Sequence, residues 1–135
     1  MPRLLWLLCL VNLIIGTGAF VIGGILAPIA EQLAISVPAA GQAMTAYALS
    51  TALLAPVVLL ATGRWPRKRA LLTALALFTL GNLLCALSNS FATLIAGRVL
   101  MGLGAVFTPI AAGIAVASVE PAKRGKALAL TFLGI

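Results

Sequence analysis

The chain has 135 residues, of which 63% are hydrophobic and only 8% are charged, and its mean hydropathy is +1.21. Soluble domains carry about 25% charged residues, so this composition excludes a soluble globular protein. The formal net charge is +7, but every basic residue except Arg98 lies before, between or after the apolar runs, and only Trp65 is interleaved with them as an aromatic residue, which argues against a nucleic-acid partner.

Four apolar stretches are long enough to cross a bilayer as helices. They cover about residues 4–30, 39–62, 70–87 and 91–118, and a fifth apolar run begins at Ala127. A helix needs roughly 20 residues to cross about 30 Å of hydrocarbon. Strands of a membrane barrel would be shorter and would alternate apolar with polar residues. The sequence therefore predicts an all-α membrane protein with four transmembrane helices and the start of a fifth.

The first span carries small and polar residues at spacings of three or four. This stripe consists of Asn12, Gly16, Ala19, Gly23 and Ala27. Such a stripe is typical of close packing against a neighbouring helix, and Asn12 is in addition a candidate to line a substrate or proton pathway. The two cysteines, Cys9 and Cys85, both fall inside predicted spans and are interpreted as apolar packing residues.

The second span contains a modest polar set, from which we take Gln42 and Tyr47 as candidates for the same pathway. Hydrogen bonding to the backbone or to a neighbouring helix is the alternative role for such side chains. The span ends in a basic loop, where Pro66 helps to stop the helix. The candidate residues of this loop are Gly63, Arg64, Arg67, Lys68 and Arg69.

The basic residues predict how the chain is oriented in the membrane. Arg3, the loop at 64–69 and the basic segment at 123–126 all fall on one side if the chain crosses four times, whereas the opposite side holds Glu31. Short cytoplasmic loops of membrane proteins are enriched in Lys and Arg. We therefore expect a multi-pass protein of the cell membrane, typical of a bacterial inner membrane, with its N-terminus in the cytoplasm.

Arg98 is the most informative single residue, because it lies within the fourth span. An Arg at the centre of a membrane helix costs about 2.5–3.5 kcal/mol on insertion scales. Such residues usually face a bundle interior or a wet cavity and mark a transport pathway. The alternative is an Arg near the outer surface whose side chain reaches the headgroups. Gly102 and Gly104 follow closely and offer a small surface for a neighbouring helix, which favours a cavity-facing Arg98.

The first and fourth spans share a local pattern. Gly-Thr-Gly-Ala at Gly16 resembles Gly-Leu-Gly-Ala at Gly102, and similar short matches follow each span at nearly the same offset. The two spans run in opposite directions, which is the arrangement of the inverted repeats from which transporters are built.

Three stretches together resemble the major facilitator superfamily, in its drug and sugar efflux branch. They are the basic loop Leu60 to Arg69, the R-x-x-x-G-x-G-A pattern that begins at Arg98, and the first-span segment Gly16 to Pro28. The resemblance covers nearly the whole chain and implies the helices of a partial N-terminal half. It implies a proton-coupled exporter of drugs, sugars or metabolites, with the basic loop at the cytoplasmic gate and Arg98 near the substrate and proton path.

The chain departs from the family pattern at several positions. Gly63 stands where the family usually has Asp, Leu59 where it has an earlier Gly, and Ala19 where many efflux relatives have an acidic residue. These departures remove the usual ion pair of the gate loop and the usual acid of the first helix. The chain also stops early in the fifth helix, so the resemblance implies a missing C-terminal half as partner.

Two other interpretations remain open. A small four-helix multidrug exporter that acts as a dimer has a similar length, but it depends on an acidic residue in its first helix. A membrane anchor or assembly subunit without transport activity is the other. Catalysis is not expected, because the chain has no His, no Asp and only two Glu residues, and for the same reason no metal or cofactor is predicted.

Overall fold

A computed structural model describes residues 2–135, and every regular element in that range is helical. Four segments have the length and composition to cross a membrane, namely Arg3–Gly24, Val37–Ala61, Arg67–Ala86 and Phe91–Ala117. These segments confirm the all-α membrane fold with four spans. The fifth apolar run is also helical and forms α8 (Arg124–Phe132), which starts three residues before the predicted position.

The first span is interrupted. Helix α1 (Pro2–Phe20) is followed by a 3₁₀ turn (Val21–Gly24) and then by α2 (Leu26–Leu33), so the single segment predicted over 4–30 is wrong in this detail. The consecutive glycines Gly23 and Gly24 lower the helical propensity at the break. Glu31, which follows the predicted first span, lies in α2, which ends where Ala34 adopts a left-handed conformation with φ 54°.

The second span is continuous from α3 (Val37–Leu49) through a π-helical turn (Ser50–Leu54) to α4 (Ala55–Ala61). Its start is capped by the Ser36 hydroxyl, which accepts a hydrogen bond from the Ala39 amide at 3.2 Å. The third span is α5 (Arg67–Ala86), which begins directly after Pro66. Three of the basic residues predicted in a loop therefore occupy the first turn of a helix instead.

The fourth span is also divided in two. It consists of α6 (Phe91–Gly104) and α7 (Phe107–Ala117), separated by a turn at Ala105 and Val106. Pro109 explains the break, because its ring clashes with the carbonyl four residues earlier and it cannot donate a backbone hydrogen bond. A short 3₁₀ turn (Pro121–Lys123) then leads into α8.

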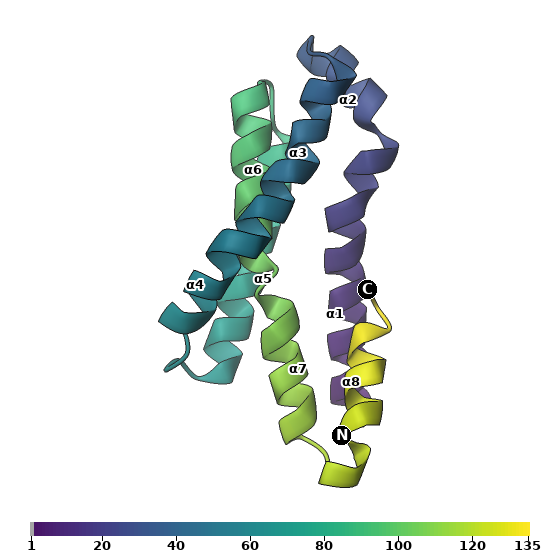
Figure 1. Cartoon of the computed structure of the whole chain (residues 1–135), viewed down its shortest axis with the longest axis vertical. Coiled ribbons are helices and arrows are strands. Elements are labelled where there is room, and N and C mark those ends of the chain that lie inside the picture. The colour runs from purple at the N-terminus through teal and green to yellow at the C-terminus, as the bar shows by residue number, and fades with distance from the viewer. Residues whose placement is uncertain (1) are drawn as a thin grey trace.

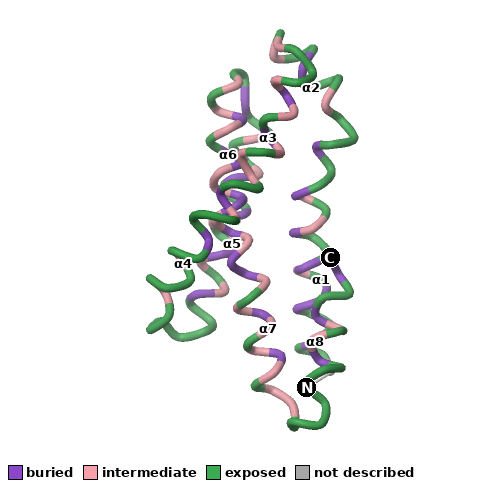
Figure 2. The backbone as a smooth tube through the Cα atoms, in the orientation of Figure 1, coloured by how far each residue is buried: buried purple, intermediate pink, exposed green. Residues whose placement is uncertain are grey.

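The helices form an elongated bundle in which α1 and α8 lie side by side, while α3, α5 and α6 form the other group (Figure 1). Helix α7 packs against α1, α5 and α8 and joins the two groups. Buried residues follow the inner faces of the helices, and exposed residues follow their outer faces (Figure 2). Phe78, Met101 and Phe107 lie at the centre of the apolar core. Many leucines on the outer faces are exposed, as expected of a surface that faces lipid.

Candidate functional site

The Arg98 side chain is the centre of the candidate site, and it is only 2% exposed. The small residues of α6 and α5 allow the helices around it to approach closely. A Cβ atom built on Gly102 would lie 2.6 Å from the Ser50 Cβ, and one built on Gly104 would lie 2.7 Å from the Ala74 carbonyl oxygen. Glycine is therefore required at both positions for α6 to seat against the second and third spans.

The guanidinium group of Arg98 binds backbone oxygens from two other spans. Its Nε donates to the Ala43 carbonyl at 3.1 Å, and its two terminal nitrogens donate to the carbonyls of Gly18 at 3.0 Å and Ala19 at 2.8 Å. It also lies over the Tyr47 ring, with 4.8 Å between Cζ and the ring centroid. Arg98 thus connects the first, second and fourth spans through the planar fork of its donors.

The position of these carbonyls explains why the charge is stable there. Gly18 and Ala19 belong to the last turn of α1, directly before the 3₁₀ turn. The C-terminal end of a helix carries partial negative charge, which favours a cation. Within residues 2–135, the sole ion pair joins Lys123 to Glu120, so Arg98 is balanced by helix dipoles and carbonyls and not by a carboxylate.

A cavity of 340 Å³ lies beside Arg98, between the first span, α5 and α6. Its apolar wall includes Ile22 and Leu94, and its polar lining is provided by Gln32, Asn82 and Ser88 together with Arg98. An apolar pocket with a few convergent polar groups is the usual form of a small-molecule site. The arrangement can therefore present one buried cation and several neutral hydrogen-bonding groups to a small ligand.

Asn12 forms a second buried polar cluster, apart from Arg98. It is fully buried, its amide nitrogen donates to the Thr131 carbonyl at 2.9 Å, and its amide oxygen accepts from the Thr108 hydroxyl at 3.0 Å. This cluster joins α1, α7 and α8. Asn12 and Arg98 stand 86 positions apart in the sequence, as do Gly16 and Gly102.

The other predicted residues are placed less centrally. Gln42 is exposed on α3 and is not among the residues that line the cavity beside Arg98. A Cβ atom on Gly16 would lie 3.6 Å from the nearest atoms of Gly134 and Ile135, and one on Gly23 would lie 3.5 Å from the Met44 side chain. Both are ordinary contact distances, so these glycines do not mark close approaches of the kind seen at Gly102.

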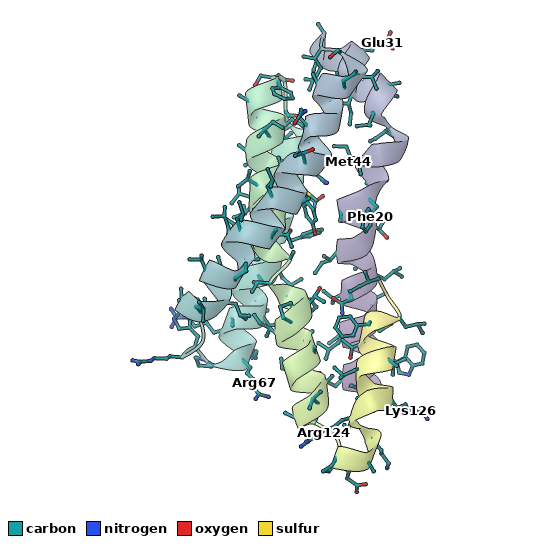
Figure 3. The ribbon with its side chains drawn as sticks, in the orientation of Figure 1. Phe20, Glu31, Met44, Arg67, Arg124 and Lys126 are labelled. Atoms are coloured by element: carbon teal, nitrogen blue, oxygen red, sulfur yellow. The ribbon has the colours of Figure 1, made fainter. Side chains whose placement is uncertain are left out.

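The predicted gate loop is exposed and lies beside α7. Gly63 and Arg67 line a small hollow of 170 Å³ together with Pro109 and Gly113 of α7. Arg69 stacks over the Trp65 ring, 4.5 Å from its centroid. The charges of the chain are separated along its length, because Glu31 lies at one end and Arg67, Arg124 and Lys126 lie towards the other (Figure 3). The two basic segments therefore share one end of the bundle.

Sequence reasoning missed the partners of both buried polar residues. The carbonyls that bind Arg98 belong to the backbone, so no side-chain pattern could reveal them. Thr108 and Thr131 are isolated hydroxyls in apolar runs. A signal for Thr108 was present, because it precedes Pro109 at the break between α6 and α7, where backbone partners are lost.

Comparison with known proteins identifies relatives over nearly the whole chain. The family model described as Major Facilitator Superfamily matches residues 8–135. The chain is 35% identical over 96% of its length to an uncharacterised transporter of this type, YbcL of Bacillus subtilis, of which it covers 34%. It is 35% identical over 90% of its length to the inner membrane transport protein YdhP of Escherichia coli, covering 31% of that protein.

Relatives named for drug resistance are also found. The chain is 34% identical over 99% of its length to a chloramphenicol resistance protein of Streptomyces lividans, of which it covers 34%. The chain thus spans about a third of the length of the curated relatives it matches. No solved structure matches it.

Proposed function

Because this chain belongs to the major facilitator superfamily, we propose that it forms part of a secondary-active transporter that exports small molecules by alternating access. Membership and the four apolar spans support a multi-pass membrane transporter over an enzyme. The observation that carries the export proposal is the buried Arg98 on the wall of a 340 Å³ cavity inside the membrane-spanning bundle. A buried intramembrane cation beside a cavity is typical of a substrate or ion pathway.

The proposed substrates are uncharged or weakly polar small molecules, with amphenicol antibiotics as the first compounds to test. This choice is supported by the cavity lining, which is mainly apolar with a few neutral hydrogen-bond groups, and by the names of the relatives. Three of the five N–H donors of Arg98 bind carbonyls and one more lies 3.8 Å from the Met101 sulfur, so it would act on a ligand through its charge and the little donor capacity that is left. Tyr47, stacked on the guanidinium, would share this pathway.

Protons are the proposed coupling ions. The carboxylates of the chain, Glu31 and Glu120, are both exposed near the ends of spans, so neither faces Arg98. A carboxylate that exchanges protons opposite Arg98 would therefore come from other helices of the assembled transporter, such as the second half on which alternating access depends.

Transport is tested by drug accumulation. Cells without their own drug exporters would express the chain, alone and together with any continuation of its reading frame, and would be loaded with radiolabelled chloramphenicol. We expect cells that express the protein to accumulate less drug than control cells. A protonophore and the Arg98→Gln substitution should each abolish this difference, whereas Arg124→Gln on the surface should leave the difference unchanged. Unaltered accumulation for every substrate tried would contradict the proposal, and coupled export by the 135-residue chain alone would favour the small dimeric exporter.

The proposed orientation places the N-terminus and both basic segments in the cytoplasm, by the excess of Lys and Arg at one end of the bundle. In a background with Cys9 and Cys85 replaced by Ala, we expect an impermeant maleimide to label Glu31→Cys in intact cells. Lys68→Cys should react only after the cells are permeabilised. Labelling of Lys68→Cys from outside would reverse the orientation.

A further inference from the structure

The second span contains one residue more than a regular helix needs to keep a single face buried. Its buried residues are Ala40, Ala43, Ser50 and Ala55. The first three follow the spacing of three and seven residues that is typical of one helix face. Ala55 follows Ser50 by five positions, which would place the two residues about 140° apart on a regular α-helix. Leu53 and Leu54, which a regular helix would bury next, are exposed.

The π-helical turn at Ser50–Leu54 absorbs this extra residue. The Ala55 amide donates to the Ser50 carbonyl, which lies five residues earlier instead of four. Pro56 favours the wider turn, because in a regular helix its ring would clash with the carbonyl of Ala52. The local sequence therefore places the π-helical turn, and the turn returns Ala55 to the buried face of the span.

The Ser50 hydroxyl fastens this turn to α6. The side chain is buried, and its hydroxyl donates to the Val99 carbonyl at 2.7 Å. The neighbouring Thr51 hydroxyl makes a longer bond of 3.4 Å to the Gly102 carbonyl. The wider turn thus presents two consecutive hydroxyls to the same helix, although successive residues of an α-helix point about 100° apart.

Tyr47 lies one helical turn before Ser50 and shares its contact with α6. A Cβ atom built on Gly102 would lie 2.8 Å from the Tyr47 carbonyl oxygen, so the two helices meet closely at this point. The ring of the same tyrosine stacks on the Arg98 guanidinium. If the extra residue were accommodated one turn earlier in the span, Tyr47 and Ser50 would rotate by about 100° and the ring would leave Arg98.

We propose that Ser50 is a positioning residue of the Arg98 site. Its bond to the Val99 carbonyl keeps the extra residue in the turn before Pro56, and this keeps the Tyr47 ring on the guanidinium. Ser50 is not among the residues that line the cavity, so it acts through Tyr47 and Arg98 and not on a ligand. Its importance for transport rests on the proposed function, but the position of the Tyr47 ring can be measured without transport.

Tyr47 is the only tyrosine among the 135 residues, so it provides its own reporter. Protein produced with fluorotyrosine gives a single fluorine NMR resonance, which is recorded from the folded chain in micelles. Arg98→Met removes the guanidinium and defines the position of the resonance without the stack. We expect Ser50→Ala to move the resonance most of the way to that position. The matched control, Ser118→Ala, loses a hydroxyl bond of 2.9 Å to a carbonyl of its own helix and should leave the resonance in place.

A one-residue deletion separates positioning from the simple loss of a hydrogen bond. Deletion of the exposed Ala52, combined with Pro56→Ala, removes the extra residue and lets the span continue as a regular helix. We expect the Tyr47 resonance to stay in place, and Ser50→Ala to have no further effect in this background, because no extra residue remains to move. Deletion of Ala48, also exposed, should displace the resonance, since it rotates Tyr47 by about 100° relative to the rest of the span.

Several results would overturn the proposal. An unmoved resonance in folded Ser50→Ala would leave Ser50 as a packing residue only. An unmoved resonance in Arg98→Met would show that the ring does not lie on the guanidinium. If the Ala52 deletion does not fold, or if Ser50→Ala shifts the resonance equally in that background, the extra residue plays no part.

A less disruptive variant provides the test if Ser50→Ala does not fold. Ser50→Cys keeps a side chain of similar size and weakens the donor, so it should move the Tyr47 resonance part of the way, and an unmoved resonance would again contradict the proposal. None of these measurements depends on drug export. Failure of export in the accumulation assay would therefore leave the positioning of Tyr47 to be judged by its own result.

Discussion

Replacing Arg98 with Lys tests whether the fork of the guanidinium, and not its charge alone, connects the first, second and fourth spans. Lys keeps the positive charge, so the cost of burying a cation is largely unchanged. Its single ammonium cannot reach all three carbonyls, which belong to Gly18, Ala19 and Ala43. If one of the three bonds survives, two are lost.

The magnitude follows from the value of hydrogen bonds between helices in a membrane. At about 0.6–1.7 kcal/mol for each bond, the loss of two predicts that Arg98→Lys lowers the free energy of unfolding by about 1–3 kcal/mol. Arg98→Met removes all three bonds, which by the same estimate lowers the free energy of unfolding by about 2–5 kcal/mol. Part of this loss is offset, because the variant no longer buries a charge.

The measurement is reversible unfolding of the purified chain in mixed micelles, titrated with a denaturing detergent and followed by far-ultraviolet circular dichroism. Arg64→Lys makes the same chemical change on an exposed side chain and should stay within about 0.5 kcal/mol of the unaltered protein. If Arg98→Lys also stays within that range, the three carbonyl contacts do not stabilise the bundle and the reasoning about this site is wrong.

The same unfolding assay tests two further features. Asn12→Leu should lower the free energy of unfolding by about 1–3 kcal/mol, because two hydrogen bonds are lost. A double-mutant cycle with Thr108→Val should give a coupling energy of about 0.5–2 kcal/mol. Additive effects of the two substitutions would show that the two side chains act independently. Gly102→Ala should cost about 1–3 kcal/mol because its Cβ would lie 2.6 Å from Ser50. Gly16→Ala, whose Cβ finds ordinary contacts, should be neutral or slightly stabilising, and equal costs at the two glycines would contradict the packing argument.

The four spans could be predicted because lipid imposes a simple rule on the sequence. Long apolar runs and the clustering of basic residues are enough to specify the number of helices and their common basic end. The interruptions were not predicted. The break at Val21–Gly24 and the turn at Ala105–Val106 lie within uniformly apolar segments, where hydropathy is insensitive to backbone geometry. Pro109 and the paired glycines were the available signals.

The candidate site was predictable only in part, for a related reason. Arg98 is conspicuous as a charge in an apolar helix, and Tyr47 was selected with it from the polar residues of the second span. Gln42 was selected on the same grounds, yet it is exposed, because polarity does not indicate which face of a helix meets its neighbours. Asn12 is buried, and its contacts with Thr108 and Thr131 depend on how three helices cross.

The attachment of Arg98 to main-chain oxygens has a consequence for how this protein can evolve. Every amino acid supplies a carbonyl, so substitutions at positions 19 and 43 that keep the helices in place would leave the anchor intact. At Gly18 the limit is volume, since a methyl group there would meet the Phe78 ring at 2.7 Å. Within residues 2–135, statistical covariation between homologous sequences should therefore find no charged companion for the arginine. The residues that bind Arg98 are constrained by their volume and not by the chemistry of their side chains. A substitution such as Ala43→Ser would change the side chain but keep the carbonyl that accepts the hydrogen bond.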